Sequence, residues 1–237
     1  MSAAPTTAVI AHRTCPLDAP ENSREGIATA AAQGADAVEL DLRLSRDGVP
    51  VMSHDPITLR TTGWPWVVSW TRASRLTGLR LRDSTETMPA FADILPLLPA
   101  GLDLAVDVKD GTAMASAIDA LEAADLLARA RLWSTDRDAV AVARLRAPAN
   151  EAAWLHDTRW ERAALGYVRR AGEVGATAVS ITDVSLTSEV VRAGHDLGLT
   201  VNSWVRTRAV QERVLDCEPD SVVTDWVVDA RADLGRA

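Results

Sequence analysis

Aliphatic and charged residues alternate along the segment 38–44, where aliphatic side chains are separated by Glu39, Asp41 and Arg43. A β-strand has a side-chain period of two, so the aliphatic side chains share one face and the three charged ones share the other. Because a strand rises about 3.3 Å per residue, Glu39 and Asp41 lie about 7 Å apart on the charged face. Burying two such carboxylates is costly unless a proton or a cation joins them, and a hard divalent metal ion would do so.

The same stretch has a simpler interpretation. Residues 46–48 are typical of a turn, and the short apolar run 49–52 after them leads to His54. An antiparallel hairpin with one charged face in water fits these residues equally well. The alternation recurs at 102–109, however, where Asp103, Asp107 and Lys109 are separated by aliphatic residues. Two such strands in so apolar a chain favour charges that face the interior of the fold.

Strand and helix patterns alternate along the whole chain and predict a parallel sheet. We expect strands at 8–11, 38–44, 102–109, 131–134, 152–156, 178–181, 199–205 and 221–224. We expect helices at 22–33, 89–98, 113–128, 135–145, 160–172, 185–197, 208–215 and 226–234. Eight strands with helices between them favour an α/β fold of the (β/α)8 (TIM) barrel type over an open doubly wound sheet. The glycine-rich phosphate loops typical of the open sheets are absent from the sequence.

The length and composition indicate one domain over residues 1–237. The periodic pattern loosens at about 56–88, where Trp64, Trp66 and Trp70 lie close together. We interpret this segment as a small insertion after the second strand, placed over one end of the sheet. The three tryptophans form either a packing patch or a platform for a ligand.

The charge and the cysteines limit the partners and the compartment. The formal net charge of −8 argues against nucleic acid as a partner. Cys15 and Cys217 are far apart and form no metal or redox motif, so we expect a reducing, cytoplasmic location. Residues 1–13 resemble a short tail leading into a strand rather than a signal peptide, and we expect no stable membrane insertion. The sequence does not determine the oligomeric state.

Polar residues gather where the predicted strands end, which is where parallel barrels carry their reactive groups. These residues are His12, Arg13, Glu39, Asp41, His54, Asp107, Lys109, Asp183, Asn202, Trp204 and Asp225. Three carboxylates suit a hard metal ion, two histidines suit acid–base chemistry, and Arg13 and Lys109 suit an anion. Lys109 is the only lysine of the chain. Trp204 is a candidate to stack on an alcohol group, or a plain core aromatic. Cleavage of a phosphate ester requires such a combination.

Several motifs resemble the glycerophosphodiester phosphodiesterase family over nearly the whole chain. They are AHR, PENS, GADAVELDLRLSRDGVPVMSHD, TLRTTG, MPAFADIL, AVDVKD, VNSWV and VVTDW. The resemblance implies a (β/α)8 barrel with a small insertion. It implies cleavage of a small glycerophosphodiester to an alcohol and sn-glycerol 3-phosphate, with a substrate hydroxyl beside the phosphate as a possible first nucleophile. The resemblance also implies a Mg²⁺ or Ca²⁺ site at Glu39, Asp41 and Asp107. It implies that His12 and His54 are the general acid–base pair. It implies that Arg13 and Lys109 contact the phosphate.

The chain departs from the family pattern at two positions. Thr14 stands where the family has glycine, and threonine adopts a positive φ poorly. Asp107 stands where the family has the longer glutamate. Two alternative functions therefore remain open: a lyase or transferase of the same barrel type that forms a cyclic phosphate, and a metal- and phosphate-binding barrel without turnover. Neither the head group nor the choice between Mg²⁺ and Ca²⁺ is determined.

Overall fold

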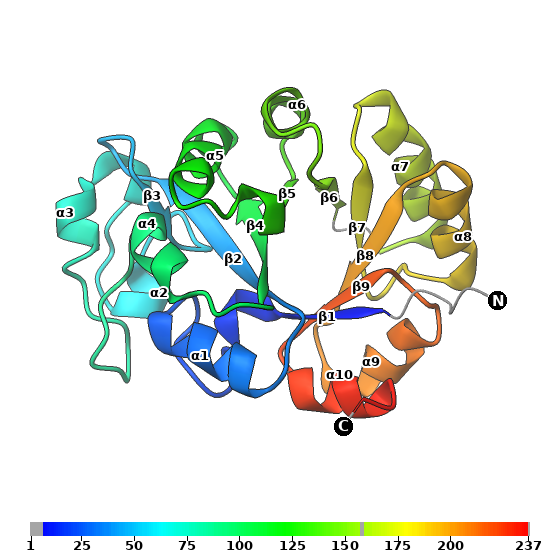
Figure 1. The fold of residues 1–237 in the computed structure, drawn as a ribbon, viewed down its shortest axis with the longest axis horizontal. Coiled ribbons are helices and arrows are strands. Elements are labelled where there is room, and N and C mark those ends of the chain that lie inside the picture. The colour runs from blue at the N-terminus through cyan, green and yellow to red at the C-terminus, as the bar shows by residue number, and fades with distance from the viewer. Residues whose placement is uncertain (1–6, 157–158, 237) are drawn as a thin grey trace.

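Eight parallel strands close into a barrel in the computed structural model of the protein, which describes residues 7–156 and 159–236 (Figure 1). The strand order is β1-β9-β8-β7-β6-β5-β4-β2-β3, and a pairing between β1 and β2 completes the ring. The eight barrel strands are β1 (Ala8–Ala11), β2 (Ala37–Leu44), β4 (Asp103–Val108), β5 (Ala130–Ser134), β6 (Ala152–His156), β7 (Ala178–Thr182), β8 (Thr200–Trp204) and β9 (Ser221–Thr224). The predicted (β/α)8 barrel is confirmed.

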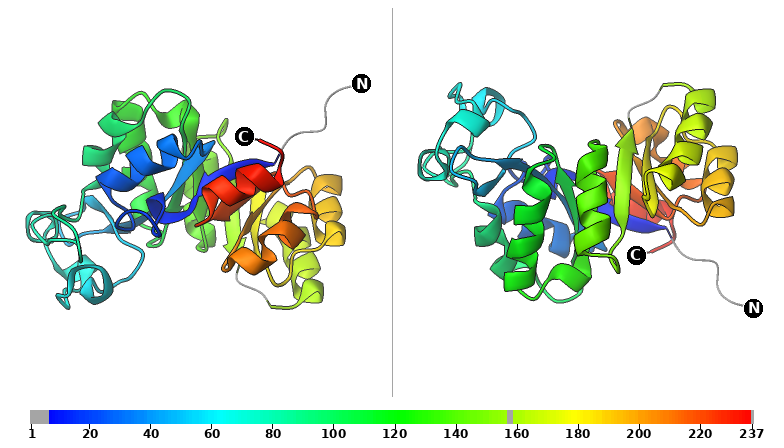
Figure 2. Two further views of the ribbon diagram at one scale, coloured as in Figure 1. Left: turned by 90° about the horizontal axis from the view of Figure 1, so that it is seen from below. Right: turned by 90° about the horizontal axis from the view of Figure 1, so that it is seen from above.

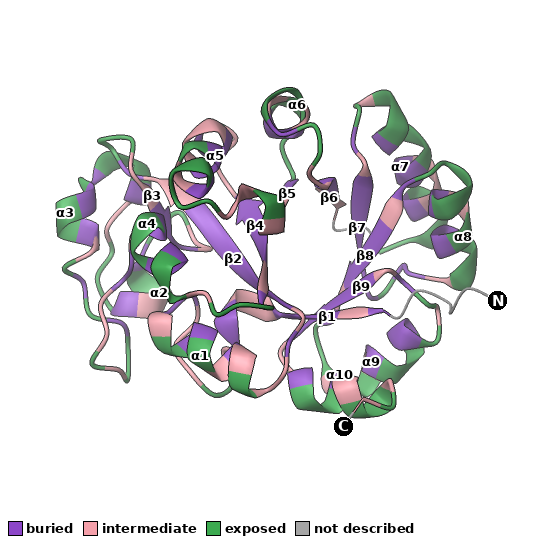
Figure 3. Ribbon diagram, viewed as in Figure 1, coloured by how far each residue is buried: buried purple, intermediate pink, exposed green. Residues whose placement is uncertain are grey.

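Helices surround the barrel and bury their apolar faces against the strands. They are α1 (Arg24–Ala32), α5 (Ala113–Ala123), α6 (Arg137–Arg146), α7 (Glu161–Glu173), α8 (Ser188–Asp196), α9 (Arg208–Leu215) and α10 (Val227–Asp233), with the short α4 (Phe91–Ile94) before β4. In Figure 3 the strands are buried almost throughout, whereas the helices are exposed on their outer sides. The main hydrophobic core lies between these two layers. Within the described residues no helix is both long and apolar enough to cross a membrane.

A second, smaller core fills the inside of the barrel. It consists of Ile10, Ala37, Ala105, Trp133, Ala153, Ala178 and Val223. Most of these are alanines, and such small residues leave room inside the barrel for the large ring of Trp133. The charged face predicted for residues 38–44 also points inward, since Glu39 and Asp41 are buried. The hairpin interpretation is therefore right only for the end of β2, where β3 (Pro50–Met52) pairs with it in antiparallel fashion.

The insertion follows β3 and stands to one side of the barrel in both views of Figure 2, where it is cyan. It contains α2 (Leu59–Thr62), α3 (Ala73–Leu76) and the 3-10 helix η2 (Val68–Trp70). A separate apolar cluster supports it, made of Val51, Val68, Ala73, Leu76, Leu79, Leu81 and Met88. Trp66 packs against this cluster, whereas Trp64 and Trp70 are exposed. The three tryptophans thus do not form one packing patch.

Two predicted helices end earlier than expected. The predicted helix 89–98 is divided into α4 and the 3-10 helix η3 (Leu95–Leu97), where Pro96 removes a backbone donor. The predicted helix 113–128 ends with α5, and Asp125 just beyond it has φ = 57°. Of residues 1–13, which we predicted to be a tail leading into a strand, the strand is β1, whereas residues 1–6 lie outside the described residues.

Candidate active site

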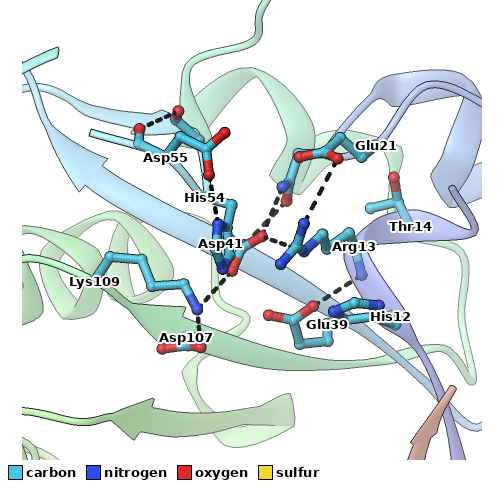
Figure 4. Close-up of polar contacts among 12 residues, drawn as sticks. His12, Arg13, Thr14, Glu21, Glu39, Asp41, His54, Asp55, Asp107 and Lys109 are labelled. Carbon is cyan, nitrogen blue, oxygen red and sulfur yellow. Dashed lines mark hydrogen bonds and ion pairs between the residues drawn. The ribbon is translucent and has the colours of Figure 1, made fainter. Parts of the chain in front are cut away.

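The pairing of β2 with β4 brings three carboxylates together at the carboxyl end of the barrel. In this parallel pairing Asp41 lies directly beside Asp107, and Glu39 lies two residues before Asp41 on the same face. All three residues are buried, and each offers a carboxylate oxygen within 4.8 Å of the others. Figure 4 shows these side chains pointing toward one another. Asp107 therefore reaches the cluster although its side chain is one methylene shorter than glutamate.

Lys109 and Arg13 offset the negative charge of the cluster. Lys109 Nζ lies 2.9 Å from Asp41 Oδ1 and also forms an ion pair with Asp107. Arg13 Nε lies 3.4 Å from Asp41 Oδ2, and the Arg13 backbone N–H donates to Glu39 Oε2 at 2.8 Å. Lys109 thus contacts two of the three carboxylates, and Arg13 contacts Asp41 through its side chain and Glu39 through its backbone.

The pKa values of these groups differ because the cations favour Asp41. Burial raises the pKa of Glu39 well above its ordinary value, and repulsion from Asp41 raises it further. Burial also raises the pKa of Asp107, although Lys109 opposes it. Burial alone would raise the pKa of Asp41, but Lys109 and Arg13 outweigh it and lower that pKa. Without a further cation, the cluster therefore retains protons on Glu39 and Asp107 to a higher pH than usual.

The turn after β1 has an unusual backbone conformation. In the 3-10 helix η1 (His12–Thr14) Arg13 has φ = 43° and Thr14 φ = 63°, and the next residue, Cys15, has φ = 65°. We expected threonine to disfavour a positive φ, yet Thr14 adopts one. Its buried hydroxyl accepts a hydrogen bond from the Ser23 backbone N–H at 3.1 Å, which helps to hold the turn. Backbone strain of this kind is typical of functional sites, and here it directs the Arg13 N–H toward the carboxylates.

Each of the two candidate acid–base histidines has a carboxylate partner. His12 Nδ1 lies 2.6 Å from Asp225 Oδ1, and His54 Nδ1 lies 2.8 Å from Asp55 Oδ1. An ionised carboxylate only accepts hydrogen bonds, so each Nδ1 carries a proton and Nε2 is available to the cavity that both rings line. Burial lowers the pKa of His54 below its ordinary value, although Asp41 and Asp55 oppose it.

A cavity of about 180 Å³ joins these groups. One side carries the polar candidates of β1, β2 and β4 and the adjoining loops. The other side, from β5 to β9, is more apolar and is lined by Trp133, Thr135, Leu155, His156, Ser180, Trp204 and Val223. The His156 ring stacks on Tyr167 at 4.2 Å between centroids, which fixes one wall. The cavity thus has a charged half and a half that suits an uncharged or apolar group.

The structure brings all eight residues that we selected from the sequence to this cavity. They are His12, Arg13, Glu39, Asp41, His54, Asp107, Lys109 and Trp204. Three other polar residues from strand ends play different parts. Asp183 pairs with Arg206 outside the cavity. Asn202 stands two residues before Trp204 on β8, does not line the cavity, and bonds to Glu151 and Ser221. Asp225 contacts His12.

Sequence reasoning missed several residues of the site. Trp133 lines the cavity, but it lies on a short strand without a clear alternation. Asn22 Nδ2 donates to Asp41 Oδ2 at 2.8 Å, whereas in the sequence Asn22 was only the start of the predicted helix 22–33. The cap of α1 is the next residue, Ser23. Asp55 follows His54 directly in sequence, and that adjacency was a signal for its contact with the His54 ring.

The three carboxylates fit a hard divalent cation. They supply oxygen ligands, which such ions prefer, and their spacing allows one ion to contact all three. Asp107 Oδ1 is buried and has no hydrogen-bond partner among residues 7–156 and 159–236. A buried carboxylate oxygen without a partner is costly, and a bound cation would remove that cost.

The carboxyl end of this parallel barrel carries a carboxylate cluster, two histidines with carboxylate partners, and the side-chain cations Arg13 and Lys109. These are the groups that cleavage of a phosphodiester requires. The model of the glycerophosphoryl diester phosphodiesterase family matches residues 12–228, and the chain therefore belongs to this family of phosphoric diester hydrolases.

Individual relatives agree with this membership. Glycerophosphodiester phosphodiesterase 1 of Bos taurus is 53% identical over 53 residues, which is 22% of this chain and only 16% of the relative. A putative glycerophosphoryl diester phosphodiesterase from Silicibacter pomeroyi has the same fold, with a TM-score of 0.85 and 22% sequence identity. The superposition covers 98% of this chain and 94% of that chain. A phosphodiesterase from Oleispira antarctica, solved with sn-glycerol-3-phosphate, superimposes with a TM-score of 0.86 and 21% identity, covering 97% of each chain.

Proposed function

We propose that the protein hydrolyses small glycerophosphodiesters to an alcohol and sn-glycerol 3-phosphate with the help of a divalent cation. The observation that carries this proposal is the convergence of three buried carboxylates and two histidines, each held through Nδ1, around one cavity. The Oleispira antarctica phosphodiesterase of the same fold was solved with sn-glycerol-3-phosphate, its product, which supports the proposed product.

Glu39, Asp41 and Asp107 would hold the cation, Mg²⁺ or Ca²⁺, which when bound supplies positive charge to the phosphoryl oxygens. Arg13 and Lys109 neutralise the remaining charge of the phosphate. One histidine accepts at Nε2 the proton of the attacking water or of the neighbouring glycerol hydroxyl. The other, as imidazolium, donates a proton from Nε2 to the oxygen of the leaving alcohol. Attack by the glycerol hydroxyl gives a cyclic phosphate, which water then opens to the phosphomonoester while the two histidines exchange their acid and base roles. Trp204, with Trp133, packs against the alcohol or glycerol part of the substrate.

A product assay tests this function. The purified protein is incubated with a panel of glycerophosphodiesters and each metal ion, and the products are followed by phosphorus NMR. We expect a free alcohol and a phosphomonoester, loss of turnover in EDTA, and recovery with Mg²⁺ or Ca²⁺. Full activity in EDTA contradicts the role of the cation. A persistent cyclic phosphate instead assigns the chain to the lyase or transferase reaction.

Two substitutions test the acid–base pair separately. His12→Ala and His54→Ala should each lower kcat by at least about 100-fold, since general acid–base catalysis contributes about 10² to 10⁴. His195→Ala is the matched control, because His195 also pairs with an aspartate but lies outside the cavity. Tight calorimetric binding of a diester by the wild-type protein without any product would support the non-catalytic alternative.

A further inference from the structure

One arginine of the insertion connects two acidic side chains beside the candidate active site. Arg60, in α2, donates from Nε to Asp55 Oδ2 at 2.6 Å. Its NH2 group donates to Glu21 Oε1 at 2.8 Å, and its NH1 group bonds to the other Glu21 oxygen. The Arg60 guanidinium therefore binds Glu21 with two nitrogens and Asp55 with the third.

Both acidic partners lead to groups of the site. The other oxygen of Asp55, Oδ1, accepts from His54 Nδ1 at 2.8 Å. Glu21 Oε2 lies 3.6 Å from an Arg13 nitrogen, and Arg13 Nε lies 3.4 Å from Asp41. Figure 4 shows Asp55 next to His54 and Glu21 next to Arg13. Through Arg60, the insertion thus reaches the loop that carries His54 and the loop that follows β1.

The contact with Arg60 restricts how Asp55 can turn. A carboxylate bonded at one oxygen only is free to rotate about its last bond, whereas Asp55 is bonded at both oxygens, to Arg60 and to His54. The planar guanidinium is always charged and holds such a geometry better than a lysine does. Burial alone would raise the pKa of Asp55, but the hydrogen bonds from Arg60 and His54 together outweigh it and lower that pKa below its ordinary value.

The other histidine provides a comparison within the same site. Asp225, the partner of His12, has no arginine partner among the described residues. His12 lies on η1, directly after a barrel strand, whereas His54 lies on the loop between β3 and the insertion. The histidine that lies on a loop is thus the one whose carboxylate partner is also bonded to an arginine.

We propose that Arg60 is a positioning residue that acts through Asp55 to orient the His54 ring in the cavity. The proposal rests on the proposed function, in which His54 moves a proton. Arg60 itself is absent from the cavity lining. It therefore does not contact the substrate itself, and the proposed effect on His54 is transmitted by Asp55.

Arg60→Met should lower kcat about 10-fold and change KM less than about twofold. Loss of a hydrogen-bond partner behind a metal-ligating side chain lowers activity about 10- to 100-fold, and we expect the lower end of that range here. Arg60→Lys should recover part of the lost kcat, since lysine keeps the positive charge but cannot bond to Glu21 and Asp55 with three planar nitrogens. Arg80→Met is the matched control, because Arg80 is an exposed arginine of the same insertion outside this set of contacts, and it should retain wild-type kcat. A rise in KM with unchanged kcat overturns the proposal.

Imidazole ¹⁵N NMR gives a readout that does not need turnover. The Nδ1 and Nε2 signals of His54 should move in Arg60→Met and in Arg60→Lys, while those of His12 and His195 stay in place. Unchanged His54 signals in either folded variant overturn the proposal. A shift of His54 in a protein that turns over no diester supports the positioning role and overturns the proposed function instead.

A double-substitution cycle tests the route through Asp55. If Arg60 acts through Asp55, adding Arg60→Met to Asp55→Asn lowers kcat less than about twofold further, because the two residues share one interaction. A full additional loss assigns the effect of Arg60 to Glu21 and overturns the route proposed here.

Discussion

At the scale of single residues, the site is a balance of buried charges. Three carboxylates share a space with Lys109 and Arg13; both cations contact Asp41, and Lys109 also pairs with Asp107. Asp107 keeps one oxygen without a hydrogen-bond partner among the described residues. The two protein cations thus neutralise the cluster only in part, and this incomplete neutralisation determines how the site responds to protons and to metal ions.

Metal binding should release protons. The pKa values of Glu39 and Asp107 are raised without a metal, so both groups keep protons to a higher pH than ordinary carboxyls. A divalent cation needs the ionised form and displaces those protons, so its affinity should strengthen as the pH rises through the raised pKa values. Isothermal titration of Mg²⁺ and Ca²⁺ in two buffers of different ionisation enthalpy measures the released protons. Identical heats in both buffers would contradict this.

Asp225 should matter to catalysis through His12. In Asp225→Asn an amide replaces the carboxylate beside His12 Nδ1 and no longer requires a proton on that nitrogen. We expect kcat to fall about 10- to 100-fold with little change in KM. Asp220→Asn is the control, since Asp220 also pairs with a histidine, at Nε2 of His195, outside the cavity. Equal effects of the two substitutions would show that the loss is not specific to the site.

At the scale of elements, the turn η1 depends on helix α1. Gly26 of α1 faces this turn so closely that a Cβ there would lie 2.1 Å from the Thr14 carbonyl oxygen. The helix can therefore approach the strained turn only because residue 26 has no side chain. Since the same turn carries His12 and Arg13, the packing of α1 supports the position of both.

Gly26→Ala should destabilise the fold by about 2 kcal/mol or more, because the atom that it meets is backbone and cannot move aside. Turnover should fall as well, since the turn with Arg13 must shift. Gly166→Ala is the matched control: it lies within α7, and a Cβ there meets nothing within 4 Å. This control should be stabilised by up to about 1 kcal/mol. Urea unfolding measures both changes, and a Gly26→Ala protein as stable as the wild type would refute the argument.

At the scale of the whole molecule, a polar chain crosses the interior of the barrel beneath the cavity. Glu151 Oε1 accepts from Trp133 Nε1 at 2.7 Å and from Asn202 Nδ2 at 2.9 Å. Asn202 Oδ1 in turn accepts from the Ser221 hydroxyl at 2.6 Å. These contacts join β5, β8 and β9 and hold Trp133, which lines the cavity.

Glu151→Ala should lower the free energy of unfolding by about 2 to 4 kcal/mol, because it leaves the Trp133 N–H and the Asn202 amide without their acceptor. Glu173→Ala, at the exposed end of α7, is the control and should change stability by less than about 0.5 kcal/mol. Chemical denaturation of the two variants under the same conditions decides the matter. Similar midpoints would mean that the polar chain contributes little.

Local sequence periodicity was sufficient for most of the elements and for the inward face of β2. Alternation at 38–44 and 102–109 predicted two charged strand faces, and four of their charged residues line the cavity, namely Glu39, Asp41, Asp107 and Lys109. The motifs around His12 and His54 pointed to the remaining candidates. Helix ends were predicted less well, because the limits at Pro96 and Asp125 depend on backbone conformation rather than on the apolar pattern.

The sequence by itself determined the alternation of strands and helices and the eight candidate residues, since both follow from side-chain periods and local motifs. Only the tertiary structure decided their partners. His12 meets Asp225 across 213 positions, because β1 pairs with β9 and Ala11 lies beside Thr224. Arg60 meets Glu21 across 39 positions, because the insertion returns to the loop after β1. Such contacts arise from closure of the barrel, and no local pattern of residues encodes the closure.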